Sequence, residues 1–177
     1  GPGLSRKGEL KAEQARAFGA QEDTMTFDDL MNEAGRKLGV ELVTHDGMTR
    51  LTIDDMEVSV LEIVALDAVA LSGVIGEPPP QGLAPLYRAM LEANFNFAGT
   101  AGATLSVSPE DGALTLARLV PLACLDADAF LSILEGFVNV LEAWRKIVAD
   151  YRPDAPGEAP PAPSAGAPQI SDGFLPV

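Results

Sequence analysis

The feature that most constrains this chain is a change of hydrophobic period within residues 81–121. Over residues 83–94 the apolar residues recur at the spacing of one helix face. Residues 103–107 and 113–119 then alternate apolar with polar, which is typical of half-buried strands. The intervening Ser108-Pro109-Glu110-Asp111-Gly112 favours a tight turn, because proline presets φ and glycine permits a positive φ. A helix that leads directly into a hairpin must lay its apolar stripe on a sheet, so the sequence predicts an α+β domain.

The patterns on either side extend this prediction to the order α-β-β-β-α-β-β-α. Thr26 followed by Asp29 resembles a capping box, and Gly39 suits a helix end, so a first helix is expected between them. Alternation over residues 50–53, 57–63 and 69–76 predicts three strands, which short connections make antiparallel neighbours. A wide apolar stripe predicts a long third helix, capped by Asp126 or Asp128 and ending near residue 151. We therefore predict a twisted antiparallel sheet of about five strands with three helices, and the pattern leaves the strand order open.

Composition divides the chain into three parts. Residues 1–24 are polar and predict a loosely attached arm, tag-like in part, in which residues 7–18 suit a short helix. Residues 25–151 form the single predicted domain. Residues 152–177 are rich in proline and lack a periodic apolar set, so a largely disordered tail is expected. Its apolar end, Gly173-Phe174-Leu175-Pro176-Val177, either frays or docks in a groove of its own or a neighbouring subunit.

Charge narrows the classes of partner. The chain has 26 acidic against 12 basic residues and a formal net charge of −14. Phosphate backbones and anionic membranes require clustered cations, so nucleic acid and membranes are not expected partners. A basic or amphipathic protein partner is favoured instead. No apolar run approaches the roughly 20 residues of a membrane span, and the single cysteine excludes an internal disulfide, so we expect a cytoplasmic protein.

Residues suited to catalysis or metal binding are scarce. His45 is the only histidine and lies in a turn-like Thr-His-Asp-Gly segment, while Cys124 lies in an apolar connection that predicts a buried, inert thiol. Two such residues are too few for a zinc site. The pairs Asp54-Asp55 and Glu110-Asp111 fall at predicted turn tips, where solvated charge is ordinary. The sequence therefore predicts a binding protein without cofactor or metal, and not an enzyme; two acidic residues converging in a cleft with raised pKa values would favour the enzyme alternative.

Several short motifs follow one another at characteristic spacing between residues 25 and 151. They are Leu91-Glu92-Ala93-Asn94, Gly102-Ala103-Thr104-Leu105, Leu114-Thr115-Leu116, Pro121-Leu122, Leu125-Asp126, Phe130, Leu134-Glu135-Gly136-Phe137-Val138 and Glu142-Ala143-Trp144. In order and spacing this set resembles the class I type III secretion chaperones, the Tir-chaperone (CesT-like) family. That family is similar in its Leu-x-Ala-Asn helix end, Gly-x-Thr-Leu strand, Pro-Leu bend and Phe-Val and Glu-x-Trp helix.

The resemblance implies a homodimeric bacterial chaperone of the cytosol that holds a secreted effector before its export. In such proteins the N-terminal region of the effector stays extended, adds a strand to the sheet and inserts apolar side chains into grooves. The effector-binding residues predicted on this basis are Phe27, Leu30, Met31, Leu38, Leu51, Ile53 and Leu116. The predicted dimer-interface residues are Leu83, Leu86, Tyr87, Met90, Asn94 and Leu105. Each of them also suits the core of a single chain, and the sequence leaves that choice open.

Two further interpretations remain at this stage. One is an adaptor of the same fold that binds a regulator or a component of the secretion apparatus, and the other is a dimerisation module without a client. Phe95-Asn96-Phe97 departs from expectation, because a loop after a helix should be polar. These two aromatic residues would plug a groove, line the dimer seam or contact the tail.

Overall fold

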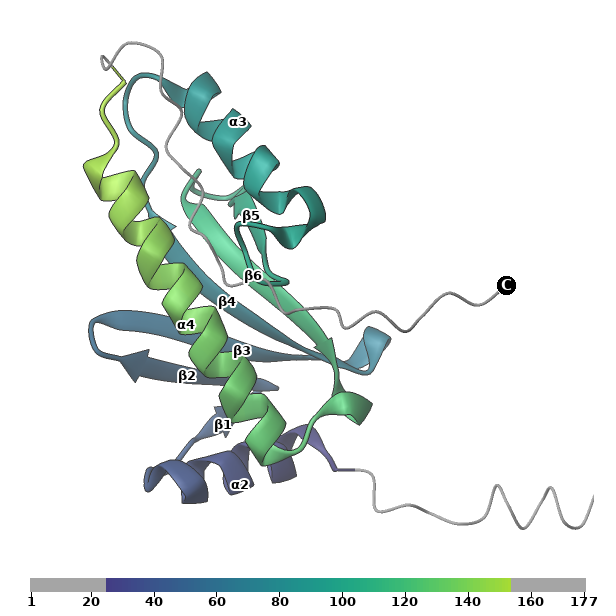
Figure 1. Cartoon of the computed structure of the whole chain (residues 1–177). Helices are drawn as coiled ribbons and strands as arrows, with labels where there is room; N and C mark the ends of the chain where they lie inside the picture. The colour runs from purple at the N-terminus through teal and green to yellow at the C-terminus, as the bar shows by residue number, and fades with distance from the viewer. Residues whose placement is uncertain (1–24, 154–177) are drawn as a thin grey trace, which may run out of the picture.

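The computed structural model describes residues 25–153 (Figure 1). The predicted N-terminal arm with its short helix, and the tail beyond residue 153 with its apolar end, lie outside the described residues. The main elements, labelled as in Figure 1, are α2 (Phe27–Leu38), β1 (Thr44–His45), β2 (Met48–Ile53), β3 (Met56–Ile63), β4 (Ala68–Gly76), α3 (Leu83–Asn94), β5 (Thr104–Val107), β6 (Leu114–Pro121) and α4 (Ala127–Asp150). Short 3₁₀ turns, η1 (Val64–Leu66), η2 (Phe95–Phe97) and η3 (Leu122–Cys124), connect some of them.

The strands form one antiparallel sheet in the order β1-β2-β3-β4-β6-β5. The predicted α+β fold is confirmed, and the structure adds the two-residue strand β1 to the five expected strands. A strand of two residues carries no alternating pattern, which is why the sequence does not indicate it. In Figure 1, α4 runs across the sheet, α2 lies near the β1 end and α3 lies near β5.

Local signals set the helix ends as predicted. The Thr26 amide donates to the Asp29 carboxylate at 3.3 Å, while the Asp29 amide donates to the Thr26 hydroxyl at 3.2 Å, which completes the capping box of α2. Gly39 ends the helix with a φ of 71°, a conformation that favours glycine. At the start of α4 the Asp126 side chain accepts from the Ala129 amide at 2.8 Å.

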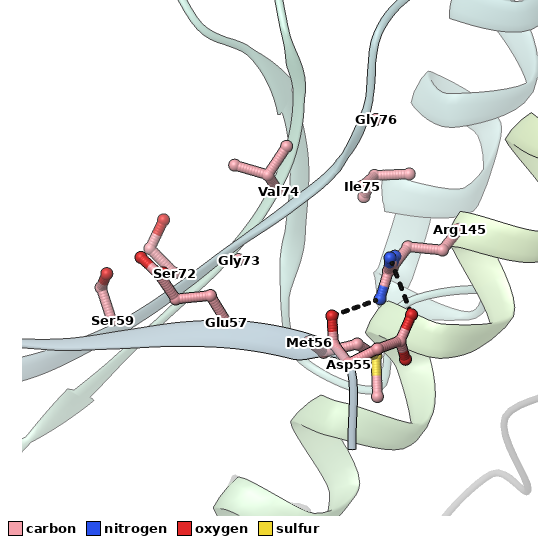
Figure 2. Close-up of a pocket in the computed structure, with 10 residues that line it drawn as sticks. All are labelled: Asp55, Met56, Glu57, Ser59, Ser72, Gly73, Val74, Ile75, Gly76 and Arg145. Atoms are coloured by element: carbon pink, nitrogen blue, oxygen red, sulfur yellow. Dashed lines mark hydrogen bonds and ion pairs between the residues drawn. The ribbon is translucent and has the colours of Figure 1, made fainter. Parts of the chain in front are cut away.

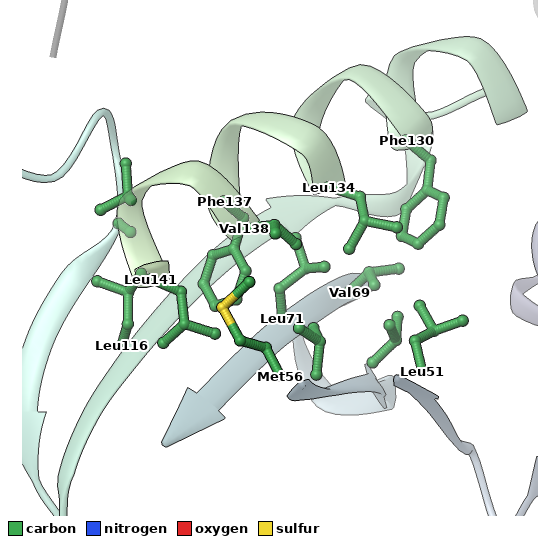
Figure 3. Packing of buried hydrophobic residues seen from close by; sticks show 14 of the residues in the cluster. Leu51, Met56, Val69, Leu71, Leu116, Phe130, Leu134, Phe137, Val138 and Leu141 are labelled. Carbon is green, nitrogen blue, oxygen red and sulfur yellow. The ribbon is translucent and has the colours of Figure 1, made fainter. Parts of the chain in front are cut away.

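The core lies between α4 and one face of the sheet (Figure 3). Phe130, Phe137 and Leu141 are at most 1% exposed, and burying a side chain of this size contributes roughly 1.5–3 kcal/mol. Packing is so close at β4 that a Cβ on Gly73 would lie 2.5 Å from a Leu141 methyl group, so any larger residue here would force the buried Leu141 side chain to move. The buried Trp144 indole N–H donates to the Gly99 carbonyl at 3.0 Å, which fixes the loop after α3 to α4.

Candidate functional site

The outer edge of β2 is only partly covered. β1 pairs with the first two residues of β2, so residues 50–53 have no partner strand on that side within the described part of the chain. The Gly47 carbonyl accepts from the Glu62 amide of β3 at 2.8 Å. Because backbone groups alternate in direction along a strand, Arg50 and Thr52 therefore direct their N–H and C=O groups outward. This segment is an exposed template for another strand.

An apolar groove of about 550 Å³ lies beside this open edge. It is bounded by the C-terminal end of α2, by β2 and by α4, and its lining residues are Leu38, Val40, Leu51, Thr52, Ile53, Asp54, Leu131, Leu134, Glu135, Val138 and Asn139. Leu38 and Val40 are 48% and 51% exposed, whereas Leu51 is nearly buried. The site thus offers backbone hydrogen-bonding groups and, next to them, apolar surface for alternate side chains of an added strand.

An ion pair ties the two helices at the groove together. Lys37 on α2 donates to the Asp128 carboxylate on α4 at 2.7 Å. This hydrogen bond raises the pKa of the Lys37 ammonium above its ordinary value. The cation of Lys37 is thereby held at the start of α4.

The structure divides the predicted effector-binding residues into two groups. Leu38, Leu51 and Ile53 line the groove together. The others, Phe27, Leu30, Met31 and Leu116, are at most 2% exposed and belong to the core. Sequence analysis missed the groove residues of α4, because Leu134 and Val138 lie on the same wide apolar stripe that packs on the sheet. The width of that stripe is the signal that could have indicated a second role for it.

The region that holds the groove, the sheet and α3 coincides with a known family pattern. The model of the Tir chaperone protein (CesT) family matches residues 29–145. The chain belongs to the Tir chaperone protein (CesT) family. The resemblance seen in the sequence motifs is therefore confirmed. No curated protein matches this CesT-family chain by sequence.

Solved structures agree with this assignment at the level of fold. One chain of the HopA1–SchA chaperone–effector complex superposes with a TM-score of 0.59 at 18% identity, covering 72% of this chain and 98% of its own length. A chain of the ExsC–ExsE complex gives 0.60 at 16%, covering 71% and 95%. The complex of the Yersinia pestis type III secretion chaperone SycH with a stable fragment of YscM2 gives 0.54 at 20%, covering 67% and 99%. The CesT-family chain thus has the fold of type III secretion chaperones along nearly the whole length of these relatives.

Residues predicted for a dimer interface on α3 lie mostly inside this chain. Leu86, Met90 and Leu105 are 0%, 4% and 5% exposed in the core of the single chain, while Leu83 and Tyr87 are half-buried. The apolar stripe of α3 therefore packs on its own sheet. Sequence periodicity identifies a buried face but does not say which chain buries it.

Asn94, also predicted at the interface, hydrogen-bonds within the chain. Its Nδ2 donates to the Leu105 carbonyl at 3.0 Å, and the Leu105 amide donates to its Oδ1 at 2.9 Å. The side-chain amide thus supplies the same pair of hydrogen bonds that a neighbouring strand would supply. At Leu105 the outer edge of β5 is closed.

The surface at the end of α3 carries large exposed apolar side chains. Leu91, Phe95 and Phe97 are 69%, 72% and 53% exposed. The two aromatic residues flagged in the sequence therefore face outward in the single chain. An exposed cluster of this kind marks a contact surface more often than an ordinary loop.

A second hollow, of about 440 Å³, lies where β3 and β4 part (Figure 2). The last paired residues are Val58 and Gly73, and beyond them the two strands are not paired with each other. Arg145 reaches from α4 and donates to the Asp55 carboxylate at 3.3 Å and to the Asp55 carbonyl at 3.4 Å. This contact holds the β2–β3 turn, and with it Asp54 at the groove, against α4.

The predicted burial of Cys124 is wrong, because the thiol is exposed. Its neighbours Leu122 and Leu125 are both 7% exposed, and the tight three-residue turn η3 places them on one side and Cys124 on the other. His45 is exposed, and its Nε2 lies 3.4 Å from the Oδ2 of Asp46. Within residues 25–153, no three His, Cys, Asp or Glu residues gather to hold a metal ion, and no helix there is long and apolar enough to span a membrane.

Proposed function

We propose that this protein is a type III secretion chaperone that binds the extended N-terminal region of a secreted effector in the bacterial cytoplasm. The effector adds a strand to the open edge of β2 and inserts apolar side chains into the adjacent groove. It is thereby kept soluble and competent for export, without a catalytic step.

The observation that carries the proposal is the contact between an unpaired strand edge and an apolar groove. Residues 50–53 supply the edge, and Leu51 and Ile53 of the same segment supply part of the groove lining. A strand bound there gains main-chain hydrogen bonds and side-chain burial at once, which is the general logic of strand addition. The chaperone–effector complex formed by HopA1 and SchA, which shares this fold, supports the proposal.

We also infer a homodimer formed through the outer face of α3. The exposed Leu91, Phe95 and Phe97 are its proposed centre, with the half-buried Leu83 and Tyr87 at its border. Light scattering on the purified protein should give twice the chain mass, and Phe95→Asp should give the single chain mass. Because Phe95 is 72% exposed in the single chain, the variant should still fold, and its melting temperature should lack the dependence on protein concentration that a wild-type dimer shows. A wild-type monomer would contradict the inferred dimer.

To test whether the groove is the binding site, we compare the proteins that co-purify with wild type and with two matched variants. Leu38→Asp places a charge on the exposed wall of the groove, whereas Val64→Asp places one on η1, where the valine is 79% exposed and does not line the groove. We expect wild type and Val64→Asp to co-purify the same secreted protein from a lysate of the native bacterium, and Leu38→Asp to lose it. Capture that Leu38→Asp does not weaken would contradict the groove as the binding site.

A second step of the same experiment distinguishes an effector chaperone from an adaptor that binds a regulator or a secretion-apparatus component. The N-terminal segment of the captured protein is expressed alone and mixed with the chaperone. Binding by that isolated segment supports effector holding. Binding only by a folded regulator or secretion-apparatus component supports the adaptor.

A further inference from the structure

We propose that the groove selects extended segments in which a lysine or arginine stands among alternating apolar residues. This inference rests on the proposed function and specifies the chemistry of the segment that the groove binds. It is carried by the two charged residues that line the groove, both of which are acidic.

Asp54 and Glu135 are the charged residues among those that line the groove. Asp54 lies in the turn after β2 and Glu135 on α4, so two of the elements that form the groove each contribute one carboxylate. Both side chains are exposed at the rim. No cation within residues 25–153 lies at ion-pairing distance from either of them.

The cations on the surrounding elements are engaged or face elsewhere. Lys37 pairs with Asp128 at 2.7 Å, Arg145 with Asp55 at 3.3 Å and Arg50 with Glu57 at 3.9 Å. Arg50 also alternates with the buried Leu51, so its side chain lies on the opposite face of the sheet. Arg36 lines a separate hollow on the other side of Val40, together with Glu41. Lys146 on α4 does not line the groove and lies eleven residues beyond Glu135, roughly 16 Å along the helix. The two rim carboxylates are therefore left for a ligand.

A strand added to β2 would present every second side chain to the groove, on the same face as Leu51 and Ile53. Apolar side chains at these positions cover the floor. A lysine or arginine at one of them can lay its aliphatic stem over the same floor and bring its charged end to the rim. The net charge of −14 favours the approach of such a segment over distance, because it attracts cations before contact.

The size of the selection follows from the exposure of the carboxylates. Solvated ion pairs change affinity only modestly, so each carboxylate should contribute roughly a two- to fivefold preference for the cationic segment. The preference should weaken as salt is added, because exposed charges are screened. Binding of the apolar positions should persist at high salt.

The test is a selection of displayed random 12-residue peptides on the full chain, with peptides that also bind Leu38→Asp removed. The selection is repeated on Asp54→Asn/Glu135→Gln and on the control Glu77→Gln/Glu110→Gln, which neutralises two exposed acids outside the groove. Asparagine tolerates the φ of 53° at position 54, so the fold should be retained. Affinities of selected peptides are then measured by fluorescence anisotropy at low and high salt.

We expect wild type and the control to enrich alternating apolar peptides with lysine or arginine, and the Asp54→Asn/Glu135→Gln protein to enrich the apolar pattern without the cation. Selected peptides should lose roughly four- to twenty-fivefold in affinity for that double variant, the combined effect of two such pairs. Apolar peptides without a cation bias in wild type would overturn this inference and leave the proposed function standing. Failure to enrich any peptide over Leu38→Asp would overturn both.

Discussion

The two ends of the sheet present their outer strands in opposite ways. At one end β1 stops after two residues, and residues 50–53 of β2 remain unpaired on the outside. At the other end α3 brings Asn94 against β5, and its amide satisfies both backbone groups of Leu105. Leu51 on β2 and Leu105 on β5 are each buried between two exposed neighbours, so the difference does not reside in the local strand pattern. It resides in what the preceding element places beside each edge.

The difference in burial explains why the open edge of β2 and the closed edge of β5 are both stable. Arg50 and Thr52 are exposed, so water can satisfy their outward backbone groups until a strand replaces it. Leu105 is only 5% exposed, and its backbone groups require a partner within the protein. A strand edge can therefore remain available for binding where its residues are exposed to solvent. Where they are buried, it needs a permanent hydrogen-bonding partner.

The largest effect is expected where the closed edge is broken. Asn94→Leu keeps a side chain of similar size at the end of α3 but removes both hydrogen-bonding partners of Leu105, and each buried group left without a partner costs about 1–3 kcal/mol. We expect the free energy of unfolding to fall by about 2 kcal/mol or more, measured by urea denaturation. Asn32→Leu, at an exposed position of α2, is the control and should change it little. Equal stability of the two variants would show that the amide does not close the edge.

A change at the open edge of β2 should weaken ligand binding and leave the stability of the fold nearly unchanged. Thr52→Pro removes an N–H that points outward and that no described residue accepts, so the fold should lose less than about 1 kcal/mol. A strand added at this edge would lose one hydrogen bond, which corresponds to roughly a two- to tenfold weaker affinity. Peptide titration followed by fluorescence anisotropy measures it, with Thr52→Ala, which retains the N–H, as the control. If both variants bind alike, the ligand does not use the β2 edge.

This contrast marks how far the sequence predicts the molecule. Periodicity and caps predict α2, α3, α4 and the hairpins, because those signals are local. Strand order, and the pairing of Asn94 with Leu105, depend on contacts between distant segments that no local pattern encodes. The groove is predicted in part: Leu38, Leu51 and Ile53 line it, whereas Met31 shares their apolar character but points into the core. An apolar side chain indicates that something covers it. Only the fold decides whether the same chain or a ligand does so.

A smaller effect concerns the turn that ends the open edge. Arg145→Met keeps the aliphatic stem on α4 and removes the contacts to Asp55, so the β2–β3 turn should open more often. The pair is largely solvated, and the free energy of unfolding should fall by no more than about 0.5 kcal/mol. Hydrogen exchange should become faster at residues 54–57 and remain unchanged at Leu105. Faster exchange at both ends of the sheet would mean that Arg145 stabilises the whole fold and does not position this turn in particular.

The smallest effect on stability is expected when the pH is lowered, and it should be local to two aspartates, one near each end of the sheet. Asp29, in the first turn of α2 and so at the opposite end of this helix from the groove, has a pKa below its ordinary value because the Thr26 hydroxyl and amide donate to its carboxylate. The Asp111 pKa is also lowered, first by the Ser108 side chain and then by the Ala113 amide, in the turn before β6. A carboxyl whose pKa is depressed on folding stabilises the fold above its unfolded pKa, and this contribution is lost as the pH falls through the folded pKa.

We therefore expect the carboxyl resonances of Asp29 and Asp111 to titrate below the ordinary aspartate range in an NMR pH series. The cap of α2 and the β5–β6 turn should loosen as these groups protonate. Asp29→Asn should abolish the pH response of the cap and leave that of the turn, and Asp111→Asn should do the reverse. The hydrogen bonds at Leu105 should persist through the same pH range, because the Asn94 amide does not titrate. Loss of those bonds together with the Asp29 cap would mean that the closed edge depends on the groove end of the molecule, and the two edges could then no longer be treated as independent.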